Sequence, residues 1–145
     1  MYGVAGNTAL KQYQHVGNTG RIEDADGHRL VTLLFEGALE RINGARAALL
    51  AGNLARKGEL IGKAVTILGG LRETLDMDAG GELAGNLDYL YGYMQRRLLE
   101  AHVRNDGEMM SEVTDLLRPL VEAWGAVPQE VRRSYQSSEV EGSSK

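Results

Sequence analysis

The chain has 145 residues, of which 43% are hydrophobic, enough for one core but without an apolar run long enough to span a bilayer. It contains no cysteine, which excludes disulfides, thiol catalysis and cysteine-bound metals. Sixteen basic and twenty acidic side chains give a net charge of −4, and their interspersed signs argue against nucleic-acid binding. The opening residues carry no secretion signal, so we expect a cytoplasmic protein with no membrane insertion.

Residues 1–24 are predicted to form a flexible N-terminal arm. They are rich in glycine, asparagine and threonine and show no sustained period, apart from a short apolar island around Leu10 and Tyr13. Two interpretations stay open. The arm is either a frayed terminus of the kind most domains carry, or a lid that lies on the rest of the protein.

The first helix is predicted to follow a cap at Asp26 and to end at Leu50, before the sequence Ala-Gly-Asn. Its apolar residues cover about 180° of the helical wheel, where a surface helix needs a stripe only a little over 100° wide. Either a partner covers part of this surface, at Phe35 and Leu39, or this helix is simply the most buried one.

The second helix is predicted from a cap at Asn53 to about Asp76. Gly58, Gly62 and Gly69 lie along its flank, and each costs about 1 kcal/mol of helix propensity relative to alanine. These glycines form either a shallow groove for the backbone of another helix or a flank that the bundle itself uses in packing. Simple tolerance of a glycine-rich composition is the third alternative.

The central helix is predicted between a glycine pair at residues 80 and 81 and the sequence Asn-Asp-Gly at 105–107. Six residues recur at steps of three and four and therefore share one side of the helix: Ala84, Leu87, Tyr91, Met94, Leu98 and Ala101. This regular spacing is typical of helices that pack nearly antiparallel in a bundle.

The opposite side of the central helix carries Tyr89 and Tyr93, with Arg96 and Arg97 one turn further on. Exposed tyrosine beside arginine is typical of protein interfaces, because both offer a large contact area with a polar end. The alternative is that Arg97 stacks on Tyr93 within the chain, which would contribute about 0.5 to 1 kcal/mol.

The fourth helix is predicted to open at Asn105 or Asp106, with Glu108 in capping-box spacing from Asn105. Pro119 predicts a kink or the start of a second segment, and Trp124 is expected to anchor the far end. Residues 128–145 are predicted to be a disordered tail. We therefore expect an all-α protein, an antiparallel up-down-up-down bundle of four main helices over residues 25–127.

Catalysis finds little support in the sequence. None of the three histidines has the Glu-x-x-His spacing of di-iron bundles, and no glycine-rich loop follows a strand, so we expect neither a metal nor another cofactor. His102 lies at the margin of the apolar side of the central helix and is predicted to be structural. A histidine phosphotransfer domain that uses His102 is the rival interpretation.

Residues 80–106, GGELAGNLDYLYGYMQRRLLEAHVRND, resemble the hallmark of the FliS-type flagellin export chaperones. The resemblance continues through EVTDLLRPLVEAW in the fourth helix, LVTLLFEGALERINGARAAL in the first and KGELIGKAVTILGGLRETLD in the second. Tyr13 falls where that family has a tyrosine in its N-terminal arm. Two departures are Gly27, where the family often has proline, and His102, where it often has asparagine.

The resemblance implies a cytoplasmic, non-enzymatic bundle that binds the disordered C-terminal segment of flagellin. It would prevent premature polymerisation and deliver the subunit to the flagellar export gate. We predict that Tyr13 lies in a gating arm and that seven residues contribute to client grooves: Phe35, Leu39, Gly58, Gly62, Gly69, Tyr89 and Tyr93. A chaperone for a hook-associated or cap protein is the alternative, and a homodimer of the client-free protein is left open.

Overall fold

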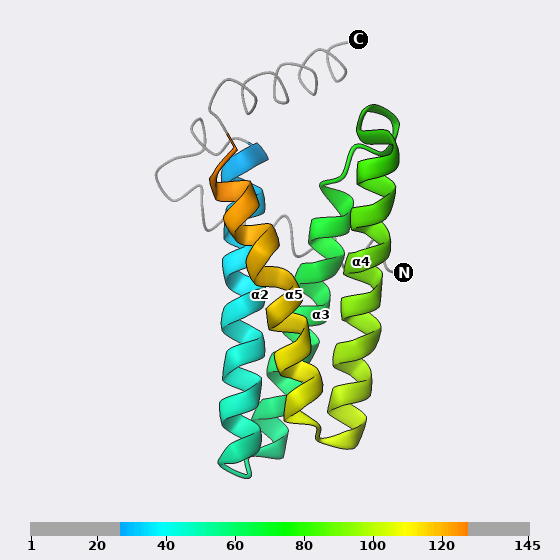
Figure 1. The fold of residues 1–145 in the computed structure, drawn as a ribbon. Helices are drawn as coiled ribbons and strands as arrows, with labels where there is room; N and C mark the ends of the chain where they lie inside the picture. Colours follow the sequence, from blue (N-terminus) through cyan, green and yellow to red (C-terminus); the bar gives the residue numbers. More distant parts are fainter. Residues whose placement is uncertain (1–26, 128–145) are drawn as a thin grey trace.

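The computed structural model describes residues 27–127, which form four α-helices and no strand. The helices are α2 (Gly27–Leu50), α3 (Leu54–Glu73), α4 (Met77–Arg104) and α5 (Gly107–Gly125). Neighbours in the chain run antiparallel, and α5 packs back against α2 (Figure 1). The predicted all-α up-down-up-down bundle is confirmed, whereas the predicted arm and tail lie outside the described residues.

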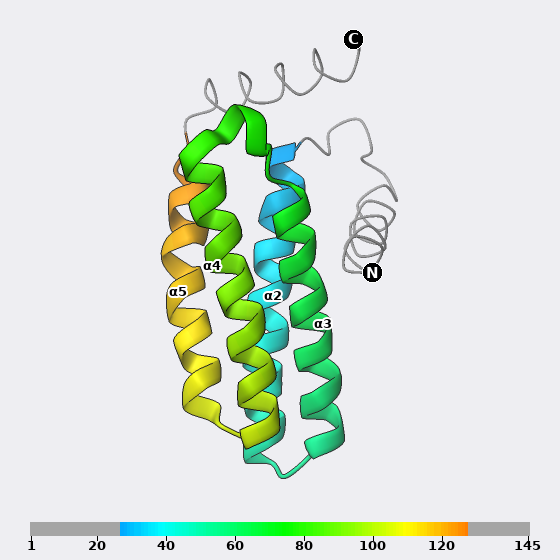
Figure 2. The ribbon, with the colours of Figure 1, turned by 90° about the vertical axis from the view of Figure 1, so that its right-hand side faces the viewer.

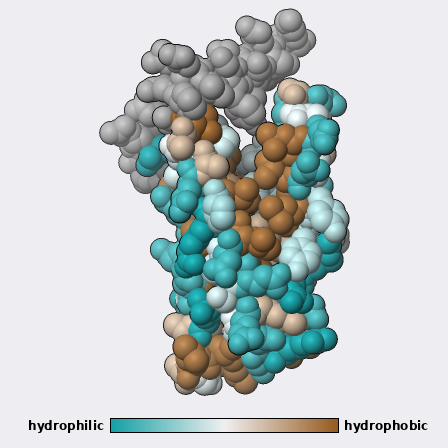
Figure 3. All heavy atoms as spheres, viewed as in Figure 1, coloured by the Kyte–Doolittle hydropathy of each residue, from teal (hydrophilic) through white to brown (hydrophobic). Residues whose placement is uncertain are grey.

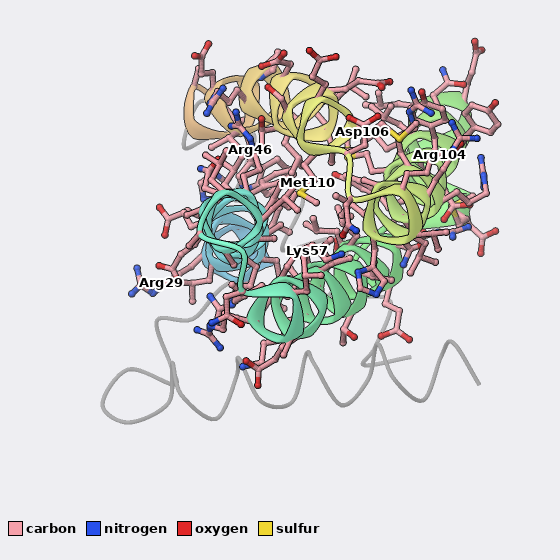
Figure 4. The ribbon with its side chains drawn as sticks, turned by 90° about the horizontal axis from the view of Figure 1, so that it is seen from below. Arg29, Arg46, Lys57, Arg104, Asp106 and Met110 are labelled. Carbon is pink, nitrogen blue, oxygen red and sulfur yellow. The ribbon has the colours of Figure 1, made fainter. Side chains whose placement is uncertain are left out.

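The four helices stand at the corners of a quadrilateral, as the view from below shows (Figure 4). Each helix packs on its two neighbours and contributes side chains to one shared core. The largest fully buried apolar residues come from every helix: Leu34, Ile42, Ile61, Leu68, Leu71, Met94, Leu98, Met110, Val113 and Leu117. None of the described helices is both long and apolar enough to cross a membrane.

Short polar side chains begin three of the helices. Asn53 accepts a hydrogen bond from a backbone N–H of α3, Asp76 does the same for α4 and Asp106 for α5, each at 2.9–3.1 Å. Asn105 has φ 52° and closes α4 in the left-handed conformation. The predicted capping box between Asn105 and Glu108 is therefore wrong, because Asn105 ends one helix and Asp106 begins the next.

The first turn of α4 is separated from the long helix by a kink at Gly81. This residue has φ 52° and ψ −128°, a backbone conformation that glycine adopts much more readily than other residues. The helix accordingly begins at Met77, three residues before the predicted start, and changes direction within the glycine pair that the sequence marked as its end (Figure 2).

Helix α5 continues through Pro119, so the predicted second segment is wrong. Proline has no N–H for the carbonyl of Asp115, four residues earlier. Both residues are exposed, which lets water bind that carbonyl without breaking the helix.

Lys57 joins the first turn of α3 to the C-terminal end of α4. It is almost completely buried, and its Nζ donates to the carbonyl of His102 at 2.9 Å and to Oδ1 of Asn105. The positive charge therefore lies at the negative end of the α4 dipole. The view from below shows Lys57 reaching inward from α3 (Figure 4).

Arg72 joins the C-terminal half of α3 to α4. Its Nε and Nη2 donate to the two carboxylate oxygens of Asp88 at 2.7 and 3.1 Å, and its Nη1 donates to Gln95 at 3.0 Å. Buried Gln95 in turn donates to the carbonyl of Val65 at 3.0 Å. The bond from Arg72 lowers the pKa of Asp88. Gly92 leaves room for this arrangement, because a Cβ there would lie 3.1 Å from the guanidinium.

Glu112 joins α5 to α4. Its carboxylate accepts a hydrogen bond from the hydroxyl of Tyr93 at 2.6 Å and one from Nε of Arg97 at 2.8 Å. The bond from Tyr93, followed by that from Arg97, lowers the pKa of Glu112. One carboxylate on α5 therefore holds two successive turns of α4.

Replacing Lys57 with methionine should keep the apolar stem but remove the donor from His102 and Asn105. We expect the free energy of unfolding to fall by about 1–3 kcal/mol, because two partly buried hydrogen bonds from a charged donor are lost. Chemical denaturation followed by circular dichroism measures the change. The control is Lys63→Met on the exposed side of the same helix, for which we expect a change within about 0.5 kcal/mol. Equal effects of the two variants would contradict the proposed role of Lys57.

Replacing Glu112 with glutamine should lower the free energy of unfolding at pH 7 by about 0.5–1 kcal/mol. Because the pKa of Glu112 is lowered in the folded protein, the stabilisation is present above the ordinary glutamate pKa. It is lost as the pH falls through the lowered value. Urea unfolding at pH 7 and in acid should therefore show the two proteins converging in acid. A difference that persists or grows there would contradict this account.

Candidate functional site

The apolar side of α4 becomes progressively more exposed towards the Gly81 end of the bundle. Leu83, Leu87, Leu90 and Met94 follow one another at steps of four, three and four, so they share one side of the helix. Met94 is fully buried, Leu90 and Leu87 are partly buried, and Leu83 is 67% exposed. The same apolar row that closes the core at one end is therefore uncovered at the other.

Helix α5 shows the same change on the side that faces α4. Leu116 lies one turn beyond Glu112, the residue that contacts α4, and Leu120 lies one turn further. Both leucines are only partly buried, whereas Leu117, on the core side, is fully buried. The two helices therefore leave apolar side chains uncovered beyond their contact at Glu112.

We call this surface the open-end groove and define it by its lining residues: Leu83, Leu87 and Leu90 of α4, and Leu116 and Leu120 of α5. Figure 3 shows apolar atoms gathered in a hollow between α5 and the upper part of α4. Tyr93, Arg97 and Glu112 close its lower end with a polar cluster. The hydrogen bond to Glu112 raises the pKa of Tyr93.

Phe35 is not a surface residue, so for this side chain the second of the two interpretations, burial of the helix within the bundle, holds. It is 3% exposed, and its ring lies 6.3 Å from that of Tyr91. Burial raises the pKa of Tyr91 to about 12. The wide apolar arc of α2 is explained by its two neighbours, because α3 and α5 each cover part of it. Leu39 is partly buried against the same core.

The three flank glycines of α3 differ in their surroundings. A Cβ at Gly58 would lie 3.0 Å from the ring of His102, and one at Gly69 would lie 3.3 Å from the amide of Gln95. The bundle itself therefore uses Gly58 and Gly69 to pack α3 against α4. Gly62 is exposed with open space around it, so only this glycine leaves part of the helix surface free for another molecule.

The two tyrosines of α4 also differ. Tyr89 is 70% exposed, as predicted. Tyr93 is partly buried and turns towards α5 rather than outward, because its hydroxyl donates to Glu112. Arg97 binds the same carboxylate. The prediction that Tyr93 is displayed is therefore wrong. Tyr13 lies outside the described residues.

The histidine and acidic side chains of the described residues do not gather into a metal site. Residues 27–127 hold no cluster of three histidine or acidic side chains that could bind a metal ion. His102 has a buried Nδ1 without a hydrogen-bond partner, and its ring packs against the site of Gly58.

The sequence does not mark Leu83, Leu90, Leu116 or Leu120 as site residues, and its apolar period places Leu87 on the packed side of the central helix. A signal was available for Leu83, because it extends the apolar row of α4 to within two residues of the breaking glycine at 81. Because the kink at Gly81 ends the straight part of α4, no preceding turn of that helix continues the row beside Leu83.

The family model described as flagellar protein FliS matches residues 9–131. The flagellar secretion chaperone FliSB of Pseudomonas aeruginosa is 50% identical over 82% of this chain and 94% of its own. The chaperones named FliS of Salmonella typhimurium and Vibrio cholerae are 40% and 37% identical, over 95% and 84% of this chain and 99% and 90% of their own. The chain therefore belongs to the FliS family, a non-enzymatic family of flagellar secretion chaperones.

Proposed function

We propose that this protein is a cytoplasmic export chaperone that binds the disordered C-terminal segment of flagellin. The observation that carries the proposal is the open-end groove, where an apolar row leaves the core and becomes exposed. Contiguous apolar surface of this kind marks interaction sites on monomeric proteins. Family membership supports a flagellar export substrate as the occupant.

The shape of the groove suits an amphipathic helix. Two antiparallel helices form its walls, and leucines one turn apart line each wall, which matches anchors spaced by three or four residues on a client helix. A disordered segment that folds on binding typically buries about 1,000–3,000 Å² and loses about 2–5 kcal/mol to ordering. Binding of this kind is specific and still reversible, as an export step requires.

The proposed client surface extends beyond the groove to Tyr89, Leu39 and Gly62. Tyr89 is exposed on α4, Leu39 is partly exposed on α2, and Gly62 leaves open space on α3. The other sequence-predicted residues described, Phe35, Tyr93, Gly58 and Gly69, already contact the protein's own side chains and would need to rearrange to join it. Tyr13 is still proposed to belong to a gating arm.

In this proposal, a flagellin segment held in the groove cannot pair with another subunit, which prevents premature polymerisation. The loaded chaperone then delivers the subunit to the flagellar export gate. A second copy of the chain could cover the groove when no client is bound, and sedimentation of the free protein checks this. A hook-associated or cap protein as the true client is an outcome that the titration below distinguishes.

Calorimetric titration with a C-terminal flagellin peptide should give saturable binding with a gain in helix by circular dichroism. Leu83→Asp should weaken it about tenfold or more, because a charge replaces a leucine that the client buries. The matched control is Leu50→Asp, which changes a leucine that is 90% exposed at the opposite end of the bundle and should leave affinity unchanged.

Equal affinities of the Leu83 and Leu50 variants would remove the open-end groove from the proposal. The same titration with peptides from hook-associated and cap proteins tests the choice of client. Binding to one of these without binding to flagellin would keep the groove and replace the client.

Replacing Gly62 with leucine should stabilise α3 by up to about 1 kcal/mol, since an exposed helical glycine is lost. We nevertheless expect weaker binding of the flagellin peptide, because the new side chain fills space that the client uses. Thermal unfolding and calorimetry measure the two effects separately. Unchanged affinity in a stabilised variant would confine the client to the groove between α4 and α5.

A further inference from the structure

Helix α5 forms one wall of the open-end groove and is fixed to the rest of the bundle by side-chain bonds near both of its ends. At the lower end, Glu112 accepts hydrogen bonds from Tyr93 and Arg97 of α4. At the upper end, Trp124 bonds to His28 of α2. Trp124 lies twelve positions after Glu112, a rise of about 18 Å along the helix, and the stretch between them includes the groove leucines of α5.

The contact between His28 and Trp124 has three components. The indole Nε1 of Trp124 donates to the backbone carbonyl of His28 at 3.0 Å. His28 Nε2 lies 3.0 Å from the backbone carbonyl of Trp124, and because a carbonyl can only accept, Nε2 carries the proton. The two rings stack with their centroids 4.7 Å apart and 11° between their planes. We call this reciprocal arrangement the terminal clasp.

The span between the two fixed points contains the weakest position of α5. Pro119 removes a backbone hydrogen bond there, and helices bend most easily at such a position. It lies between Leu116 and Leu120, the two groove residues of α5. Bending at Pro119 would therefore move one wall of the groove relative to the other.

The partly buried leucines of the two walls favour such bending. Leu116 and Leu120 face Leu87 and Leu90 across the groove, and bringing the walls together would remove apolar surface from water. A groove that is uncovered and apolar tends to close on itself unless its walls are held apart. The terminal clasp holds the end of α5 against α2, on the side away from α4.

We infer that His28 and Trp124 are positioning residues, and that the terminal clasp holds the Pro119-weakened half of α5 at the spacing from α4 that the open-end groove requires. The consequence for client affinity rests on the proposed function. Loss of the clasp lets α5 shift, so the groove must be re-formed when a client binds, and this reorganisation weakens binding.

The spacing can be measured without any client. The sequence has no cysteine, so cysteines introduced at Asn86 and Ala123 can be spin-labelled selectively. Both positions are exposed. Asn86 lies seven residues before Tyr93, and Ala123 lies eleven residues after Glu112, so each shares a side of its helix with that residue. Because Tyr93 and Glu112 contact each other, these sides of α4 and α5 face each other. Electron–electron double resonance between the labels reports the width of the groove. We expect His28→Leu to shift or broaden the distance distribution.

The clasp has its own spectroscopic signal, since Trp124 is the only tryptophan in the sequence. His28→Leu should shift its emission to the red as the indole becomes more accessible to water. Flagellin-peptide affinity should fall about five- to tenfold. His28→Gln retains a side-chain N–H donor and should restore both affinity and spacing towards those of the unchanged protein.

Asp106→Ala is the control for stability alone. It removes the N-cap at the other end of α5, which should lower the Tm by a few degrees, and leaves the clasp intact. Affinity and label spacing should therefore stay unchanged in this variant. Equal weakening by Asp106→Ala and His28→Leu would overturn the inference, because affinity would then follow stability only.

The remaining outcomes separate the inference from the proposed function. A red-shifted emission in His28→Leu with unchanged label spacing and unchanged affinity would overturn the inference while the chaperone function stands. Absence of flagellin binding by the unchanged protein, together with altered spacing in His28→Leu, would refute the proposed client. The positioning role of the clasp would then be supported by the spacing alone.

Discussion

Glu112 determines where the bundle is closed and where it is open. Its carboxylate binds two successive turns of α4, through Tyr93 and Arg97, and so fixes how closely α4 and α5 approach. On one side of this contact lie the fully buried residues Met94 and Met110. On the other side the same apolar rows continue without complete cover. A polar cluster therefore marks the boundary between core and binding surface.

The fold could be predicted from the sequence because its determinants are local. The apolar period of α4, the capping residues Asn53 and Asp106 and the glycine pair at 80–81 each act within one or two turns of chain. Where two local rules competed, the choice depended on the neighbouring helix. Asn105 could begin α5 or end α4, and it ends α4 in the left-handed conformation, where its side chain accepts a hydrogen bond from Lys57 of α3.

The candidate site could be predicted only in part, because exposure depends on how far helices diverge. Leu83 and Met94 belong to the same row of α4, yet one is largely exposed and the other fully buried. Phe35 looked available on a helical wheel and lies in the core, since the wheel does not show that α2 has two packed neighbours. Tyr93 turned inward because its partner, Glu112, lies on another helix. Such relations between distant segments leave no signal in one sequence.

The even number of antiparallel helices brings the chain back to the end at which it entered the bundle. Gly27 and Gly125 accordingly lie on either side of the terminal clasp, at the same end as the open groove (Figure 1). A fluorescent protein joined directly at Gly27 or Gly125 would therefore be attached near the mouth of the groove. The turn at Ala51 and Gly52 lies at the opposite end of the bundle, so a label inserted there would be far from the groove (Figure 1).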